Sequence, residues 1–271
     1  MSSSEQSATA GRRRWWKRAP LAVGVAYGAF AALARVGAEY LIFLPHHPGY
    51  EVGGDITLIP TTNDEQIAVL TRTIPDAAFT VLFLHGNQED LSEIHDRLEV
   101  FEQLGYSSVA IDYRGYGRSD GTATEASAYL DADAAYDYLT DTLKVPPRQI
   151  IVLGRSLGGA IAIDLASRRD VGGLVVESTF TSAFRVALPF RILPFDQFTS
   201  IDKIGHVRCP VAIMHGTADA LISLRHGHEL FAAARGPKLS LWVDDATHQD
   251  LLEMAGERYG DTVSALSKLI Q

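Results

Sequence analysis

The stretch that most constrains the fold is residues 150–160, which read IIVLGRSLGGA. Four apolar residues lead into a Gly-x-Ser-x-Gly motif, and a stretch rich in Ala, Ile and Leu follows it. This pattern predicts a buried strand, a sharp turn that carries Ser156, and a helix packed close behind. Side chains at Gly154 and Gly158 would clash with neighbouring chain at such a turn. Ordinary strand-to-helix turns also use small residues, so the motif indicates a nucleophilic serine only together with the predicted strand before it and the predicted helix after it.

Segments typical of strands and helices alternate from about residue 45 onward. We expect strands over residues 55–59, 66–73, 79–84, 107–111, 173–177, 211–215 and 239–243, and another beginning at residue 150. Helices are expected over residues 91–104, after a capping box of Thr122 and Glu125, after Ser156, over residues 224–234 and over the C-terminal residues from about 255. Such alternation predicts an α/β fold with a mostly parallel sheet covered by helices on both faces.

The charge of the chain is unevenly distributed. The formal net charge is −9, but residues 1–20 carry +4, which leaves −13 on the remainder. An acidic body argues against a nucleic-acid partner. The single cysteine, Cys209, excludes an intrachain disulfide and a cysteine metal cluster. The histidine pairs His46-His47 and His226-x-His228 lack further ligands at suitable spacing, so we expect neither a metal nor a cofactor.

The N-terminal region divides into a basic tail, residues 1–18, and an apolar segment, residues 19–44, ahead of the α/β domain over residues 45–271. Residues 19–34 contain no charge, but 16 residues are fewer than the roughly 20 that span a bilayer as a helix. Basic residues and two tryptophans precede this segment, which favours a single-pass anchor with a cytoplasmic N-terminus and the domain outside. The alternatives are an export signal cleaved near Ala34, or an amphipathic helix that lies on the membrane or on the protein.

A base and an acid for Ser156 are expected near the carboxyl ends of later strands, where reacting groups collect in an open α/β sheet. A serine hydroxyl needs a base to take its proton, and the base needs a group that orients it. His248 follows the strand over residues 239–243, and Asp219 follows the strand over residues 211–215. The order Ser156, Asp219, His248 suits a catalytic triad in this architecture. Glu177, at the end of the strand after the serine helix, is the alternative acid.

Hydrolysis of an acyl group also needs donors for the developing oxyanion. The backbone N–H of Leu157, directly after the serine, is the first predicted donor. The second is expected from the loop after the strand over residues 79–84, where the N–H of Asn87 is our choice and that of Gln88 the alternative. We expect His85 to brace this loop rather than to act as a base.

Residues from about 40 to 271 resemble the α/β-hydrolase superfamily. The motifs that carry the resemblance are His85-Gly86-Asn87, the turn over residues 112–119, the serine motif over residues 154–159, the Asp219 loop and His248. The N-terminal segment ahead of Leu41-Ile42-Phe43-Leu44-Pro45 is similar to that of a membrane-tethered branch related to monoacylglycerol lipase-like and serine aminopeptidase-like enzymes. The resemblance implies eight strands with the second antiparallel, and a structural role for Arg114, Gly115 and Gly117 beside the oxyanion loop.

The segment over residues 178–207 stands where such enzymes carry a lid. Its aromatic residues either line an apolar wall for an acyl chain or pack the short lid onto the body. We therefore expect a serine hydrolase that cleaves small-molecule carboxylic esters with small to medium acyl groups through an acyl-enzyme, without a cofactor. A peptidase, amidase or thioesterase on the same triad remains an alternative, as does a non-catalytic binding protein tethered to a membrane. The oligomeric state is open.

Overall fold

An eight-stranded sheet forms the centre of the main unit of the chain. The strands are β1 (Ile56–Pro60), β2 (Gln66–Arg72), β3 (Thr80–Leu84), β4 (Ser107–Ile111), β5 (Ile150–Arg155), β6 (Gly173–Glu177), β7 (Val211–Gly216) and β8 (Lys238–Val243). Their order in the sheet is β1-β2-β4-β3-β5-β6-β7-β8. Strand β2 pairs antiparallel with both of its neighbours, and the strands from β3 to β8 pair parallel. The predicted eight-stranded, mostly parallel sheet with an antiparallel second strand is confirmed.

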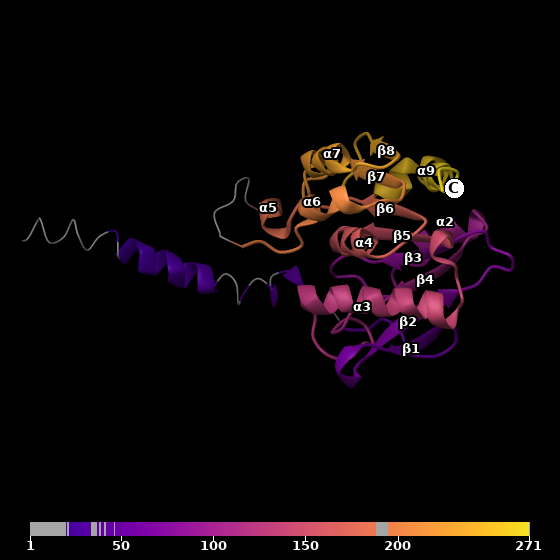
Figure 1. Cartoon of the computed structure of the whole chain (residues 1–271), viewed down its shortest axis with the longest axis horizontal. Coiled ribbons are helices and arrows are strands. Elements are labelled where there is room, and N and C mark those ends of the chain that lie inside the picture. Colours follow the sequence, from indigo (N-terminus) through magenta and orange to yellow (C-terminus); the bar gives the residue numbers. More distant parts are fainter. Residues whose placement is uncertain are drawn as a thin grey trace, which may run out of the picture. The chain divides into compact units, whose positions relative to one another are not determined.

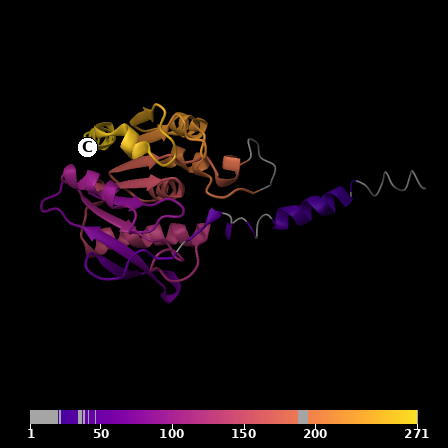
Figure 2. The ribbon, with the colours of Figure 1, turned by 180° about the vertical axis from the view of Figure 1, so that it is seen from behind.

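Every residue of strands β3 to β7 is buried, whereas the edge strand β8 buries fully only Val243. Central parallel strands are covered on both faces, so they read as continuous apolar runs instead of alternating patterns. One apolar cluster includes residues of α3 (Glu125–Asp137), α4 (Leu157–Arg168) and α7 (Leu224–Ala233). The other includes residues of α2 (His95–Gln103), α8 (Leu251–Ala255) and α9 (Glu257–Ser267). The two clusters place helices on both faces of the sheet (Figures 1 and 2).

Short helical turns complete the described elements. They are η1 (Thr62–Asp64), η2 (Tyr138–Thr142), η3 (Pro147–Gln149), α5 (Ala183–Ala187), α6 (Ser200–Lys203) and η4 (Ile204–His206). Three of these, α5, α6 and η4, lie between β6 and β7, in the segment expected to act as a lid. Phe180 and Phe198 in this segment are buried, whereas Phe184 and Phe195 are half-buried. The aromatic residues of this segment that are best buried therefore pack against the body.

Three predicted boundaries were wrong. Helix α2 begins at His95 and not at residue 91, because Asp90 binds the Ser92 N–H and holds residues 90–92 in a turn. The capping box is Thr124 with Ser127, not Thr122 with Glu125. Glu125 accepts hydrogen bonds from the Tyr129 hydroxyl and the Phe198 N–H instead. The C-terminal helix is interrupted between α8 and α9 by Gly256, whose φ of 54° ends the first piece.

The structure, a computed structural model, describes residues 20, 22–33, 37, 39–40, 42–45, 47–187 and 195–270. The chain divides into one unit over residues 1–41 and another over residues 42–271. The basic tail and residues 188–194 of the lid segment lie outside the described residues, as do parts of the apolar segment over residues 19–44. Residues 22–33 are helical, and no helix among the described residues is long and apolar enough to cross a membrane. Placement of this segment in a membrane stays a prediction.

Candidate active site

Ser156 lies on the turn between β5 and α4, in a backbone conformation that few residues other than glycine adopt. Its φ is 53° and its ψ is −116°, in a region that costs a non-glycine residue about 1–3 kcal/mol. Neighbouring chain holds this conformation from both sides. The Ser156 N–H donates to the Glu177 carbonyl at 2.8 Å, and the Thr179 hydroxyl donates to the Ser156 carbonyl at 2.7 Å. A strained serine held in this way presents its hydroxyl at the carboxyl edge of the sheet.

The two motif glycines allow the serine turn to pack tightly, as the sequence predicted. A Cβ atom at Gly154 would lie 2.1 Å from the Gly158 carbonyl oxygen. One at Gly158 would lie 2.0 Å from the Leu84 carbonyl oxygen, at the end of β3. Both obstacles are backbone atoms, which cannot swing aside as a flexible side chain would. The turn, the helix α4 and the loop after β3 are therefore closer together than any larger residue would permit.

We expect Gly158→Ala to lower the free energy of unfolding by about 3 kcal/mol, because the added methyl group must displace backbone. Gly260→Ala in α9 is the matched control, since its Cβ would meet only the side chains of Val100 and Leu104, at ordinary distances of 3.6 and 3.9 Å. Alanine is the better helix former, so this control should gain about 0.5–1 kcal/mol. Urea unfolding followed by circular dichroism measures both changes. Equal midpoints for the two variants would contradict the tight-packing interpretation.

The structure brings the three predicted triad residues together in one hydrogen-bonded line. His248 lies on the loop after β8 and Asp219 on the loop after β7. The Ser156 Oγ and His248 Nε2 atoms are 3.0 Å apart, and His248 Nδ1 lies 2.8 Å from Asp219 Oδ2. Since an ionised carboxylate can only accept, Nδ1 donates to Asp219 and Nε2 remains free to accept the serine proton. All three residues are buried.

Asp219 is held as a carboxylate by the donors around it. Its Oδ1 atom accepts the N–H groups of Leu221 and Ile222 at 3.0 and 2.7 Å. His215 Nε2 lies 3.4 Å from Oδ2 and also donates to the Ile222 carbonyl at 2.7 Å. Burial acts to raise the pKa of Asp219, but hydrogen bonds from His215, His248 and the Ile222 N–H outweigh it and hold that pKa well below its usual range. The carboxylate is thus ready to stabilise a cationic His248.

Two backbone amides beside Ser156 are free to bind an oxyanion. Leu157 is the first residue of α4, so its N–H has no acceptor inside the helix. The Asn87 N–H donates to none of the residues that the structure describes. The Gln88 N–H, by contrast, already donates to the Asn87 side-chain oxygen at 3.0 Å. This occupation favours Asn87 over Gln88 as the second predicted donor.

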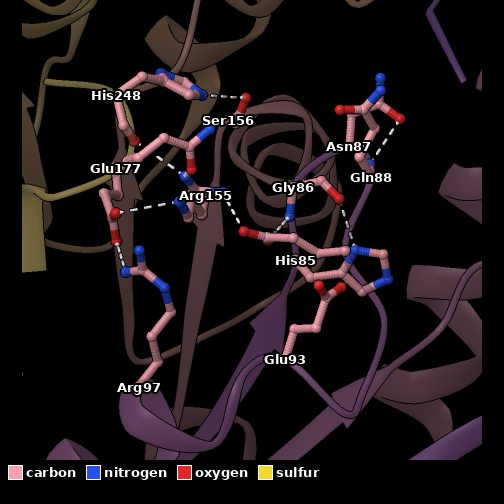
Figure 3. Close-up of polar contacts among 12 residues, drawn as sticks. His85, Gly86, Asn87, Gln88, Glu93, Arg97, Arg155, Ser156, Glu177 and His248 are labelled. Atoms are coloured by element: carbon pink, nitrogen blue, oxygen red, sulfur yellow. Dashed lines mark hydrogen bonds and ion pairs between the residues drawn. The ribbon is translucent and has the colours of Figure 1, made fainter. Parts of the chain in front are cut away.

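Glu177, the alternative acid, belongs to a different group of charges. Its Oε2 atom accepts hydrogen bonds from Arg97 of α2 at 2.7 Å and from the Tyr259 hydroxyl of α9 at 2.8 Å. Its Oε1 atom lies 3.5 Å from Arg155 Nε. Within the described residues, Glu177 makes no hydrogen bond with His248. The contacts of Glu177 are those of a structural anion beneath the site (Figure 3).

Arg155, directly before the serine, is the residue that sequence reasoning missed. Its guanidinium donates to the His248 carbonyl at 2.9 Å (Figure 3). It also forms an ion pair with Glu89. Glu89 in turn accepts the Gly86 N–H at 2.7 Å. One buried side chain therefore joins the serine turn, the loop of the base and the loop of the oxyanion donor. An arginine at the end of an otherwise apolar strand was the available signal.

His85 braces the loop after β3, as the sequence predicted. Its Nδ1 atom lies 2.7 Å from the Gly86 carbonyl oxygen, and its Nε2 atom lies 3.2 Å from Asp112. Burial acts to lower the pKa of His85, but the hydrogen bond and charge of Asp112 outweigh it and raise that pKa. Arg114 lies within the turn over residues 112–119 and pairs with Asp131 at 2.8 Å. These buried contacts support the expected structural role of the turn over residues 112–119.

Comparison with known proteins identifies relatives of this chain. Residues 75–194 match the family described as Serine aminopeptidase, S33. Alpha/beta hydrolase domain-containing protein 17B of Homo sapiens is 35% identical over 214 residues, which cover 78% of this chain and 73% of that protein. The chain belongs to the α/β-hydrolase family. The same protein of Xenopus laevis shares 35% identity over the same length. The predicted family resemblance is confirmed, and membership supports hydrolase activity.

Solved structures repeat the fold of this α/β-hydrolase. The Pyrococcus furiosus esterase Pf2001 superposes with a TM-score of 0.68 at 22% identity, over 82% of this chain and 98% of that one. Alpha/beta hydrolase domain-containing protein 10 from mouse superposes with a TM-score of 0.64 at 17% identity, over 80% of this chain and 100% of that one. At such low identity the likeness concerns the fold alone.

Proposed function

We propose that this α/β-hydrolase is a serine hydrolase that cleaves carboxylic esters through a covalent acyl-enzyme. The observation that carries the proposal is the continuous line from Ser156 Oγ through His248 to Asp219, with contacts of 3.0 and 2.8 Å. Each contact lies within the range that proton transfer requires. The free amides of Asn87 and Leu157 beside the serine add the donors that an acyl-transfer site needs.

In the first half of the reaction, Ser156 Oγ attacks the ester carbonyl carbon while His248 Nε2 takes the hydroxyl proton. The carbonyl oxygen becomes an oxyanion that the N–H groups of Asn87 and Leu157 bind. Asp219 keeps the His248 ring in the correct tautomer and stabilises its cationic form. Collapse of the tetrahedral intermediate breaks the bond to the alcohol, which leaves with the proton from His248. Water then attacks the acyl-serine by the same steps, with His248 first as base and then as acid.

The acyl group that the site accepts is proposed to be small to medium in size. The segment between β6 and β7 offers the partly buried ring pair Phe184 and Phe195, whose centroids lie 5.8 Å apart edge to face. Phe198 of the same segment is fully buried against the body. Among the described residues of this segment, the half-buried rings of Phe184 and Phe195 provide a limited apolar wall, which suits short chains better than long ones.

Fluorophosphonate labelling followed by a substrate panel tests this function. We expect rapid labelling of Ser156 and hydrolysis of p-nitrophenyl esters with kcat/KM that depends on acyl length and declines for long chains. Thioesters and aminoacyl amides with matched acyl groups form the other arms, because the matching family is described as a serine aminopeptidase. Preference for aminoacyl amides over alkyl esters would make the protein a peptidase. Equal rates across acyl lengths would contradict the apolar wall, and absence of labelling would favour a non-catalytic binding protein.

A further inference from the structure

The segment ahead of β1 lies against the loop that carries the proposed oxyanion donor. This segment, here called the strap, comprises residues 42–45 and 47–51. The Leu44 N–H donates to the Asn87 side-chain oxygen at 3.0 Å, and the Gly49 N–H donates to Asp90 Oδ2 at 2.7 Å. The Tyr50 hydroxyl donates to Asp112, the carboxylate that pairs with His85. The strap therefore contacts the loop over residues 85–90, or its direct support, at three separate points.

The side-chain oxygen of Asn87 accepts hydrogen bonds from three donors. Besides the Leu44 N–H, it accepts the Tyr116 hydroxyl at 2.5 Å and the Gln88 N–H at 3.0 Å. Burial raises the pKa of Tyr116, so its hydroxyl keeps the proton that it donates. Three donors on one oxygen fix the Asn87 side chain, and with it the plane of the Asn87 peptide. The N–H of that peptide is the proposed oxyanion donor.

Aromatic packing holds the strap in place beside these donors. Phe43 is only 5% exposed and meets the Tyr116 ring edge to face, with centroids 6.4 Å apart. On its other side it meets Phe198, at the end of the lid segment, with centroids 5.8 Å apart. Edge-to-face pairs of this kind contribute about 0.5–1.5 kcal/mol beyond the area they bury. Phe43 thus keeps both the Leu44 amide and the Tyr116 hydroxyl close to Asn87.

We propose that the strap is a positioning element of catalysis: through the Asn87 side chain, the Leu44 N–H and the Tyr116 hydroxyl aim the Asn87 N–H at the oxyanion. The inference rests on the proposed function, because an oxyanion forms only if Ser156 attacks a carbonyl. A positioned donor acts on the transition state more than on the bound substrate, so its loss lowers kcat and leaves KM nearly unchanged.

Three substitutions in the full-length chain separate this role from simple packing. Tyr116→Phe removes one donor, Leu44→Pro removes the other, and Asn87→Ala removes their common acceptor. We expect each to lower kcat for a p-nitrophenyl ester by about tenfold, less than the 10²–10³ that follows complete loss of an oxyanion donor. Tyr136→Phe is the matched control: it deletes a phenol hydroxyl on α3 that donates to the Asp170 carbonyl, away from the site, and should leave kcat unchanged.

Double substitutions decide whether the donors act through Asn87. In an Asn87→Ala background, Tyr116→Phe and Leu44→Pro should cost no further activity, because their shared acceptor is already absent. Effects that multiply in the double variants would overturn the proposal, since each residue would then act independently. Asn87→Ala removes the acceptor of the Leu44 N–H without changing the strap backbone, so the test survives if Leu44→Pro fails to fold.

Hydrogen exchange of residues 85–90 provides a readout that does not depend on turnover. We expect faster exchange of the amides in this loop in Tyr116→Phe and Asn87→Ala than in Tyr136→Phe, whatever the substrate. Unchanged exchange together with unchanged kcat in an active, labelled enzyme would refute the strap's role while leaving the proposed function intact. A wild-type protein that is neither labelled nor active would refute the proposed function, and exchange would still report whether the strap holds the loop.

Discussion

Ser156→Ala is expected to lower kcat for an activated ester by about 10⁵-fold or more and to abolish labelling by a fluorophosphonate probe. The hydroxyl oxygen is the proposed nucleophile, and nothing else in the hydrogen-bonded line can form the acyl-enzyme. Removing it leaves His248 and the free amides in place, so residual hydrolysis by bound water is the most that can remain. Turnover measured before the probe is added, and labelling measured afterwards, report both effects on one preparation.

Ser178→Ala is the matched control for this substitution. Ser178 is also buried, also follows a strand at the carboxyl edge of the sheet and also has a positive φ, of 46°. Its Oγ atom has no hydrogen-bond partner among the described residues and makes no contact with His248. The control should keep both labelling and turnover. Labelling that survives in Ser156→Ala and disappears in Ser178→Ala would contradict our proposal, because the nucleophile would then be Ser178 after β6 and not Ser156 after β5.

The residues that the sequence correctly placed together depend on local chemistry or on the topology of the sheet. The serine turn needs small residues at Gly154 and Gly158 because backbone atoms approach within 2.0–2.1 Å of where a Cβ would lie. Asp219 and His248 were found because parallel strands bring their carboxyl ends to one edge of the sheet, wherever they lie in the chain. For the same reason the sequence kept Glu177 as an alternative to Asp219, since both follow strands at that edge.

The parts that sequence missed depend on side chains that meet across long separations. Arg155 reaches both Glu89 and the His248 carbonyl, and no spacing rule connects residues 66 and 93 positions apart. Leu44 meets Asn87 through its backbone N–H, which no side-chain pattern reports. The capping box was misplaced for a related reason: Glu125 has partners elsewhere in the fold, so the shorter Ser127 takes the capping position. Membrane attachment rests on composition alone and stays a prediction.

Asp219→Asn and Glu177→Gln together test which acid orients the base. We expect Asp219→Asn to lower kcat by about 10⁴-fold, because an amide cannot stabilise the cationic ring and can hold His248 in the wrong tautomer. The protein should stay folded, since an asparagine keeps an oxygen for the Leu221 and Ile222 amides. A kcat within tenfold of the wild type would remove Asp219 from the triad.

Glu177→Gln should lower the stability of the fold and largely preserve kcat, which is the reverse of the result expected for Asp219→Asn. It leaves the buried Arg97 guanidinium, 2.7 Å from the present carboxylate, without a counter-charge. Breaking one side of a buried ion pair costs about 3 kcal/mol, so the midpoint of urea unfolding should fall clearly. Because Glu177 does not touch His248, the folded fraction should keep kcat within about tenfold of the wild type. A stable Glu177→Gln variant that lost as much kcat as Asp219→Asn would move the acid to β6. The same result would require His248 to turn away from the carboxylate that it now contacts at 2.8 Å.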